Sequence, residues 1–263
     1  MGYEDVGFTG IRYFHGIILL CIVRLLILKS RVQTKMDIPH PSALFRGFPE
    51  NFAEFLFLLQ FNNTIDRLQG NKPVYKRLIT EPLTMLFHTL TPVALSVSET
   101  VITRPSKCVS NMYSDMRFSR STPLKGYMYI RFREPFGEKD ILGLYFDMGC
   151  DYYGFGIRVY KQSSAGMEKI REYAIKNNIL FTRELDNLAL LNMKIIGENY
   201  ARDRYPEIKN AALNDFLNKK GFYIERARPI NKAVYNGKLR DEIAEAYIGL
   251  KGLYTQLRNA LYS

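Results

Sequence analysis

The feature that most constrains the fold is a run of alternating apolar and polar residues in the middle of the chain. Four segments alternate with a period of two: Asn111 to Phe118, Tyr127 to Arg133, Leu142 to Met148 and Tyr152 to Tyr160. This period is typical of β-strands that bury one face. The connections between the segments are short, which predicts an antiparallel meander.

The alternation separates two faces of the predicted sheet. The apolar face, predicted to form the core, collects Met112, Met116, Phe118, Met128, Ile130, Phe132, Leu142, Leu144, Phe146, Met148, Phe155, Ile157 and Val159. The opposite face is polar and aromatic, with Tyr113, Asp115, Arg117, Tyr127, Tyr129, Arg131, Arg133, Tyr145, Asp147, Tyr152, Arg158 and Tyr160, and it is interrupted by Gly143, Gly154 and Gly156.

Helical periodicity flanks this region on both sides. Helices are predicted over 49–61, 73–90 with an interruption at Pro82, 165–178, 180–190, 206–219 and from Lys238 to the end of the chain. Short strands are predicted at 193–196 and 221–227. Residues 37–263 are therefore expected to form one α+β domain, with an antiparallel sheet of four to six strands. Helices, including a long C-terminal one, are expected to cover its apolar face.

The first 36 residues stand apart from this pattern. Their apolar stretch, Ile17 to Leu28, is twelve residues long and contains Arg24, whereas a membrane-spanning helix needs about 20 apolar residues. Two interpretations remain: a short interfacial membrane anchor, or sequence upstream of a true start at Met36. A membrane contact is expected only under the first.

Composition excludes several classes of protein. Hydrophobic residues make up 47% of the chain and charged residues 24%, which is typical of a globular protein rather than a disordered one. The three cysteines form no Cys-x-x-Cys pair and the three histidines are scattered, so neither a disulfide framework nor a metal site is expected. No cofactor motif is present, and a reducing cytoplasmic compartment is predicted. Nothing in the sequence indicates an oligomeric state.

Positive charge is concentrated on one part of the chain. The formal net charge is +11, and residues 101–136 hold seven Lys and Arg against two acidic residues. The simplest interpretation is a solvated basic face, because net charge alone affects solubility and non-specific attraction rather than fold.

Several short motifs are also similar to one known family. They are Phe45-Arg46-Gly47-Phe48, Asn62-Asn63, Tyr75 with Pro82, Tyr113-x-Asp115-x-Arg117-Phe118 followed by Pro123-x-Lys125, Gly143-Leu144-Tyr145-Phe146, Gly154-Phe155-Gly156 and Ile170-Arg171. In this order they resemble the family called domain of unknown function 2461, over essentially all of 37–263. Where that family often has Arg-Glu-Trp-Phe, this chain has Ile65 to Leu68 and no Trp. The resemblance supports the fold and the location of the site, but it implies no reaction.

The polar sheet face is predicted to bind an anionic ligand, either nucleic acid or a phosphorylated small molecule. Arg offers a planar fork for phosphate, Lys a point charge, and Tyr a flat ring with a hydroxyl group. The glycines on this face would let a ligand approach the backbone. The candidate ligand-binding residues are Tyr113, Arg117, Lys125, Tyr129, Arg131, Tyr145 and Arg158.

Two other interpretations of the same face stay open. The chain is an enzyme acting on a phosphate-containing substrate if Asp115 serves as general base or metal ligand, with Lys125 or Arg117 as an electrophilic clamp. Alternatively, Asp115 and Asp147 only form ion pairs with neighbouring arginines, each worth a few tenths to about 1 kcal/mol.

Overall fold

The computed structural model describes residues 44–61, 63–113 and 124–263. The chain divides into two units, Met1–His40 and Pro41–Ser263, and the description below concerns the second. Asp115, Met116, Arg117 and Phe118 lie outside the described residues, as does Asn62.

The centre of the second unit is a five-stranded sheet in which all paired strands are antiparallel. Its strands are β1 (Met128–Arg133), β2 (Ile141–Met148), β3 (Tyr152–Tyr160), β4 (Lys194–Ile196) and β5 (Tyr223–Pro229). They are ordered β1-β2-β3-β5-β4. The α+β class and the antiparallel sheet are confirmed. Of the first predicted strand, residues 111–113 join none of these five, and Tyr113 forms only an isolated bridge with Leu124.

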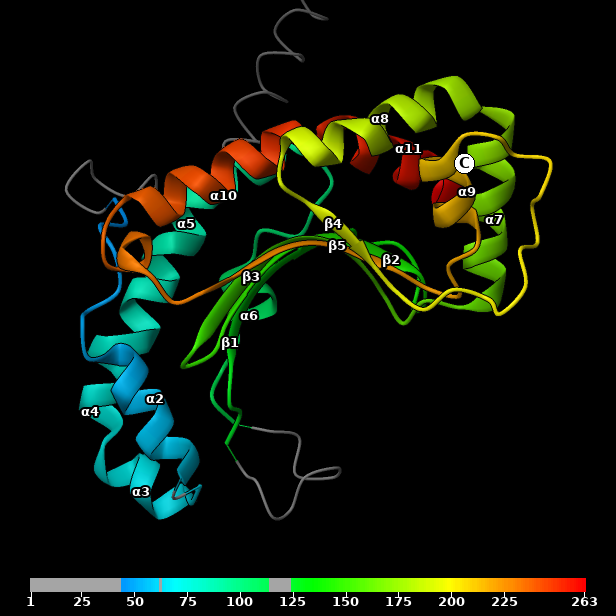
Figure 1. The fold of residues 1–263 in the computed structure, drawn as a ribbon. Helices are drawn as coiled ribbons and strands as arrows, with labels where there is room; N and C mark the ends of the chain where they lie inside the picture. Colours follow the sequence, from blue (N-terminus) through cyan, green and yellow to red (C-terminus); the bar gives the residue numbers. More distant parts are fainter. Residues whose placement is uncertain (1–43, 62, 114–123) are drawn as a thin grey trace, which may run out of the picture. The chain divides into compact units, whose positions relative to one another are not determined.

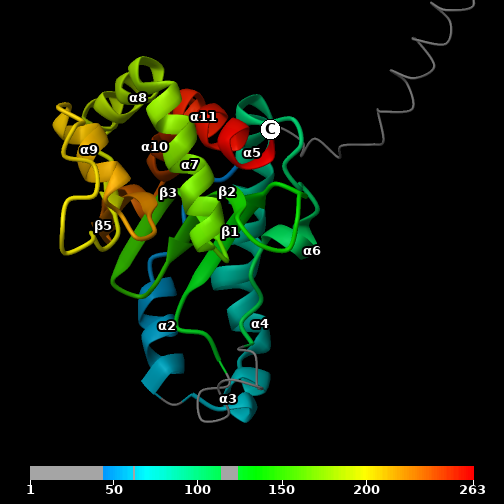
Figure 2. The same cartoon turned by 90° about the vertical axis from the view of Figure 1, so that its right-hand side faces the viewer.

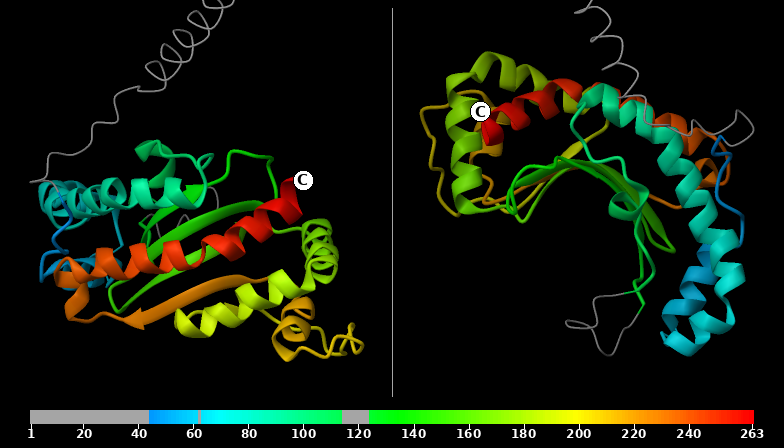
Figure 3. Two further views of the ribbon diagram at one scale, coloured as in Figure 1. Left: turned by 90° about the horizontal axis from the view of Figure 1, so that it is seen from above. Right: turned by 180° about the vertical axis from the view of Figure 1, so that it is seen from behind.

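The sheet is curved, and helices lie on its convex side (Figure 1, Figure 3). These are α5 (Glu81–Val97), α8 (Asn178–Leu190), α10 (Lys238–Gly249) and α11 (Lys251–Tyr262). The described residues of the predicted apolar face are all buried beneath them; Phe132, Phe146 and Phe155, for example, are each 0% exposed. Successive side chains along a strand point to opposite faces of the sheet. The residues that alternate with these buried ones therefore point to the concave side, which carries the polar face.

The remaining helices extend the layer at both ends (Figure 1, Figure 2). Their bounds are α2 (Phe52–Phe61), α3 (Ile65–Gly70), α4 (Lys72–Tyr75), α6 (Pro105–Cys108), α7 (Ser164–Lys176) and α9 (Ala211–Leu217), with a π-helical turn at Lys76–Thr80 and a 3₁₀ turn at Lys232–Tyr235. The helix predicted over 73–90 changes to a π-helical turn before Pro82, since that turn ends at Thr80 and α5 begins at Glu81 with Pro82 in its first turn.

The C-terminal helix is long, as predicted, but it is divided at Leu250 into α10 and α11. The cause is contact with α8. A Cβ atom on Gly249 would lie 2.5 Å from Leu191 Cδ2, and the Gly249 carbonyl oxygen accepts a hydrogen bond of 3.2 Å from the Asn187 side chain. That carbonyl has a partner outside its own helix, so the end of α10 is stabilised at this residue.

Candidate functional site

Three rows of side chains cross the concave side of the sheet. The strand register places Tyr129, Asp147, Gly154 and Ala227 in the first row, Arg131, Tyr145, Gly156 and Glu225 in the second, and Arg133, Gly143, Arg158 and Tyr223 in the third. We call this surface the concave site. Residues far apart in sequence meet here because β5 lies beside β3.

Two arginines of the concave site are stacked on tyrosine rings. The guanidinium carbon of Arg131 lies 3.6 Å from the Tyr129 ring centroid, and that of Arg158 lies 5.1 Å from the Tyr145 centroid and 4.6 Å from the Tyr223 centroid. Stacking of this kind holds a guanidinium group in place without occupying its N–H donors.

Neither Arg131 nor Arg158 forms a hydrogen bond or an ion pair within the described part of the chain. Asp147 lies on the same surface but forms no ion pair with either arginine there. The described arginines therefore give no support to the interpretation that Asp147 only pairs with neighbouring arginines, and Arg117 lies outside the described residues. The two guanidinium groups, both partly exposed, keep their N–H donors available.

Gly154 makes room above β3 for side chains from the strands on either side. A Cβ atom on Gly154 would lie 3.0 Å from Glu225 Oε1 and 3.2 Å from Asp147 Oδ1. Over the same strand, the Tyr145 hydroxyl group donates a 3.0 Å hydrogen bond to Glu225 Oε1. Tyr145 is only 1% exposed although it points to the polar side. Side chains of Tyr145, Asp147 and Glu225 thus come together above Gly154.

The electrostatics of this group are unusual. Burial, and then the nearby Glu225 carboxylate, raise the pKa of Asp147 from 3.8 to about 6, although Arg158 and Arg131 oppose the shift. Burial and the same Glu225 also raise the pKa of Tyr145, so its hydroxyl group stays protonated and donates. Asp147 Oδ1 is buried and has no hydrogen-bond partner. The concave site therefore contains a carboxyl group that titrates near neutral pH.

The structure places the predicted ligand-binding residues in two groups. Tyr129, Arg131, Tyr145 and Arg158 come together in the concave site. Tyr113 and Lys125 lie on the segment leading into β1, where the Lys125 ammonium group donates to the Asn111 carbonyl at 3.1 Å and lies 5.4 Å from the Tyr129 centroid. Burial lowers the pKa of Lys125. Arg117 and the candidate base Asp115 are outside the described residues, and their roles stay predictions.

The end of α2 holds this segment in place. The Asn63 side chain donates to the Leu124 carbonyl at 2.9 Å and accepts from the Leu124 amide at 2.8 Å, while Gln60 donates to the Gly126 carbonyl at 2.7 Å. The Asn63 side chain thus pairs with the Leu124 backbone as a neighbouring strand would. It thereby fixes the approach to β1, and with it Tyr129.

Sequence reasoning missed Glu225, although a signal was present. The predicted strand 221–227 alternates, so Tyr223, Glu225 and Ala227 share one face. What the sequence did not reveal was that this face adjoins β3, because the two strands are separated by three helices and β4.

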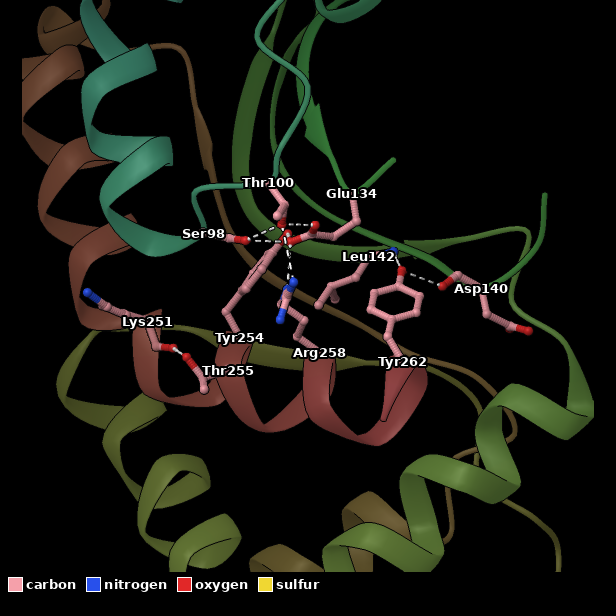
Figure 4. A network of polar contacts seen from close by, with 10 residues as sticks. All are labelled: Ser98, Thr100, Glu134, Asp140, Leu142, Lys251, Tyr254, Thr255, Arg258 and Tyr262. Atoms are coloured by element: carbon pink, nitrogen blue, oxygen red, sulfur yellow. Dashed lines mark hydrogen bonds and ion pairs between the residues drawn. The ribbon is translucent and has the colours of Figure 1, made fainter. Parts of the chain in front are cut away.

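A second buried carboxylate lies at the far end of β1 and has a structural role. Glu134 is 2% exposed and accepts hydrogen bonds from Ser98 at 2.7 Å, Thr100 at 2.5 Å and Tyr254 at 3.0 Å (Figure 4). Arg258 Nε approaches Glu134 Oε1 to 3.5 Å, which is ion-pair distance without hydrogen-bond geometry. The network fastens α11 to β1 and to the residues after α5.

Two searches of the described residues for other kinds of site were negative. Within 44–61, 63–113 and 124–263, no three His, Cys, Asp or Glu side chains gather closely enough to hold a metal ion. In the same ranges, no helix combines the length and apolarity that crossing a membrane requires.

Residues 51–255 match a family model described as "Conserved hypothetical protein (DUF2461)". A comparison with curated proteins found no match. The matched range includes every strand of the concave site.

Proposed function

We propose that the concave site binds an anionic ligand carrying phosphate groups. The chain belongs to the DUF2461 family of conserved hypothetical proteins. The observation that carries the proposal is the pair of guanidinium groups of Arg131 and Arg158, which stack on tyrosines while their N–H donors have no partner among the described residues. Arginine forks prearranged in this way match the oxygen atoms of phosphate.

The surroundings of the two arginines support a ligand with flat parts as well as charge. Tyr127 and Tyr152 are exposed beside the site, and the rings of Tyr127 and Tyr129 are 6.1 Å apart. Aromatic rings beside basic side chains suit a nucleobase next to its phosphate, and stacking contributes about 1–3 kcal/mol per base. The preferred ligands are therefore single-stranded nucleic acid and nucleotides.

The proposal is tested by binding measurements on the full chain. Single-stranded RNA, single-stranded DNA and a panel of nucleotides are titrated at two salt concentrations, with wild type, Arg131→Ala and Arg158→Ala. We expect each variant to weaken binding by about 10- to 100-fold, as loss of a charge-assisted contact worth about 1.5–3 kcal/mol implies. For nucleic acid, the plot of log affinity against log salt concentration should also become less steep, by about the slope that one phosphate contact contributes.

Arg202→Ala is the matched control. It removes the same charge from an exposed position in the segment between β4 and α9. If Arg202→Ala weakened binding as much as Arg131→Ala, the attraction would be due to net charge and the concave site would not be the binding site.

A second candidate function is an enzyme acting on a phosphate-containing substrate. The observation favouring it is Asp147, a carboxyl group whose pKa of about 6 suits general acid or base catalysis. The predicted base Asp115 is the other candidate. A screen of phosphoesters and nucleotides, with and without Mg²⁺, decides between binding and catalysis. Turnover that is lost in Asp147→Asn or Asp115→Asn, with the fold intact, establishes an enzyme. Binding without turnover in wild type and in both variants contradicts the enzyme.

A further inference from the structure

The Asp147 carboxyl group presents a problem of hydrogen bonding. Its Oδ1 atom is buried and has no hydrogen-bond partner among the described residues. Leaving a buried polar group unsatisfied destabilises a protein by about 1–3 kcal/mol, and a charged group by more. Another carboxylate lies nearby on this side, because Glu225 Oε1 and Asp147 Oδ1 lie 3.0 and 3.2 Å from the Cβ position of Gly154. Two ionised carboxylates in one desolvated space repel each other.

Other charged and titratable groups lie near this pair on every strand, and a tyrosine of one helix interacts with Asp147 electrostatically. They are Tyr129 and Arg131 on β1, Tyr145 on β2, Tyr152, Arg158 and Tyr160 on β3, Lys194 on β4, Tyr223 on β5 and Tyr247 on α10. The arginines attract negative charge, but neither forms an ion pair with Asp147 or Glu225 within the described residues. Repulsion between the two carboxylates is therefore only partly offset.

We propose that the concave site takes up its anionic ligand together with one proton, which Asp147 and Glu225 share. The proton sits on Asp147 Oδ1 and is donated to Glu225 Oε1, so the buried oxygen gains a partner. It comes from the solvent, and the charge of the site becomes more positive by one unit. The inference rests on the proposed function, since it assumes that the anion binds beside Arg131 and Arg158.

The geometry favours a proton over a metal ion as the occupant between the carboxylates. The positively charged guanidinium groups of Arg131 and Arg158 already lie near the pair. They repel a divalent cation more strongly than a single proton. The Tyr145 hydroxyl group donates to Glu225 Oε1, which uses one of its lone pairs. A proton needs only one further acceptor position, whereas Mg²⁺ needs an octahedral shell of oxygen atoms.

Binding and proton uptake must then be linked. An anion beside the arginines stabilises the protonated pair, and the protonated pair stabilises the anion, by the same free energy. Affinity should rise as the pH falls from 8 to 6, by up to about tenfold per pH unit when one full proton is taken up.

The first test uses the ligand-free protein, so it is independent of the proposed function. Side-chain carboxyl groups labelled with ¹³C are titrated by NMR in wild type and in Glu225→Gln. We expect one aspartate in wild type with a pKa near 6 and a lower pKa for the same group in Glu225→Gln. Titration of Asp147 at its ordinary value in wild type would overturn the shared proton.

The second test measures the linkage. Calorimetric titration with a short single-stranded oligothymidylate, whose phosphodiesters do not titrate in this range, is run at pH 7.5 in two buffers of different ionisation enthalpy. We expect net proton uptake in wild type, and binding without uptake in both Asp147→Asn and Glu225→Gln. Binding by wild type with no uptake contradicts the inference while leaving the proposed function intact. If wild type does not bind this probe, the proposed preference for single strands fails, and the NMR titration alone decides the carboxyl pair.

A third arm tests the alternative occupant. Mn²⁺ is added to the labelled, ligand-free protein at pH 7.5. Selective broadening of the Asp147 and Glu225 carboxyl signals at micromolar Mn²⁺ would replace the proton with a divalent cation and overturn the inference.

Discussion

At the scale of single residues, the concave site combines groups that cost stability with groups that provide it. Within the described residues, Arg131 and Arg158 form no hydrogen bond or ion pair, and the buried Asp147 Oδ1 has no hydrogen-bond partner. Glu134 is the opposite case, since three hydroxyl groups and one guanidinium group surround its carboxylate. Polar groups arranged for a ligand rather than for the fold are typical of functional sites.

Asp147→Asn is expected to stabilise the protein at pH 7.5. Because the pKa of Asp147 is raised on folding, its ionisation destabilises the native state: the native state binds more protons than the unfolded state between pH 4 and 6, and stability falls as the pH rises through this window. The shift from 3.8 to about 6 corresponds to at most about 3 kcal/mol, so we expect a gain of about 1–3 kcal/mol at pH 7.5. Urea unfolding at pH 7.5 and pH 4.5 measures it. A gain equally large at pH 4.5 would contradict the assignment.

The Glu134 network should respond in the opposite direction. Glu134→Gln removes the charge toward which three hydroxyl groups donate and beside which Arg258 lies, and we expect a loss of about 2–4 kcal/mol. Tyr254→Phe removes one hydrogen bond, and about 1 kcal/mol should be lost. Urea unfolding of the two single variants and the double variant gives their coupling. If Glu134→Gln cost no more than Tyr254→Phe, the carboxylate charge would not be what holds α11 to β1.

At the scale of elements, β3 determines the geometry of the site. Gly154 and Gly156 lie two residues apart on the same face, but their surroundings differ. A Cβ atom on Gly154 would meet only the ends of the Glu225 and Asp147 side chains, at 3.0 and 3.2 Å. On Gly156, where φ is +158°, it would lie 1.9 Å from the Ile224 backbone oxygen. One glycine makes space for side chains, whereas the other permits β3 and β5 to pair.

This contrast predicts different outcomes for the two alanine variants. Gly156→Ala should lose more than about 3 kcal/mol or fail to fold, because the backbone of β5 would have to move. Gly154→Ala should lose less than about 1.5 kcal/mol, because flexible side chains can move aside. Gly70→Ala is the control, since nothing lies within 4 Å of its Cβ position. Thermal unfolding followed by circular dichroism distinguishes them, and equal losses at 154 and 156 would show that the two positions do not differ.

At the scale of the whole molecule, local patterns predicted more than long-range contacts. The buried and polar faces of β1, β2 and β3 follow from the alternation of apolar and polar residues, which is visible within each short segment of the sequence. The division at Leu250 depends on Leu191 and Asn187 of another part of the chain, and the pairing of Asp147 with Glu225 depends on β5 lying beside β3. Such contacts leave little trace in a single sequence, so the second carboxyl group of the site could not be predicted.

The first 35 residues are expected to be dispensable for folding of the second unit. The described core runs from Phe45 to Leu261 and closes on itself through contacts among its own helices and strands. A chain beginning at Met36 should therefore be soluble and should melt within a few degrees of the full chain. Insolubility, or a melting temperature lower by ten degrees or more, would contradict this expectation.

The edges of the sheet bear on how the molecule behaves at high concentration. Strand β4, at one edge, is three residues long and begins with the exposed Lys194. At the other edge, the Ser110 backbone and side chain hydrogen-bond to the Tyr129 backbone, each at 2.9 Å. Long edges with free backbone groups recruit strands from other chains and lead to aggregation. One edge here is short and charged and the other is partly occupied, so neither margin of the curved sheet offers a long free strand from which fibrils could grow.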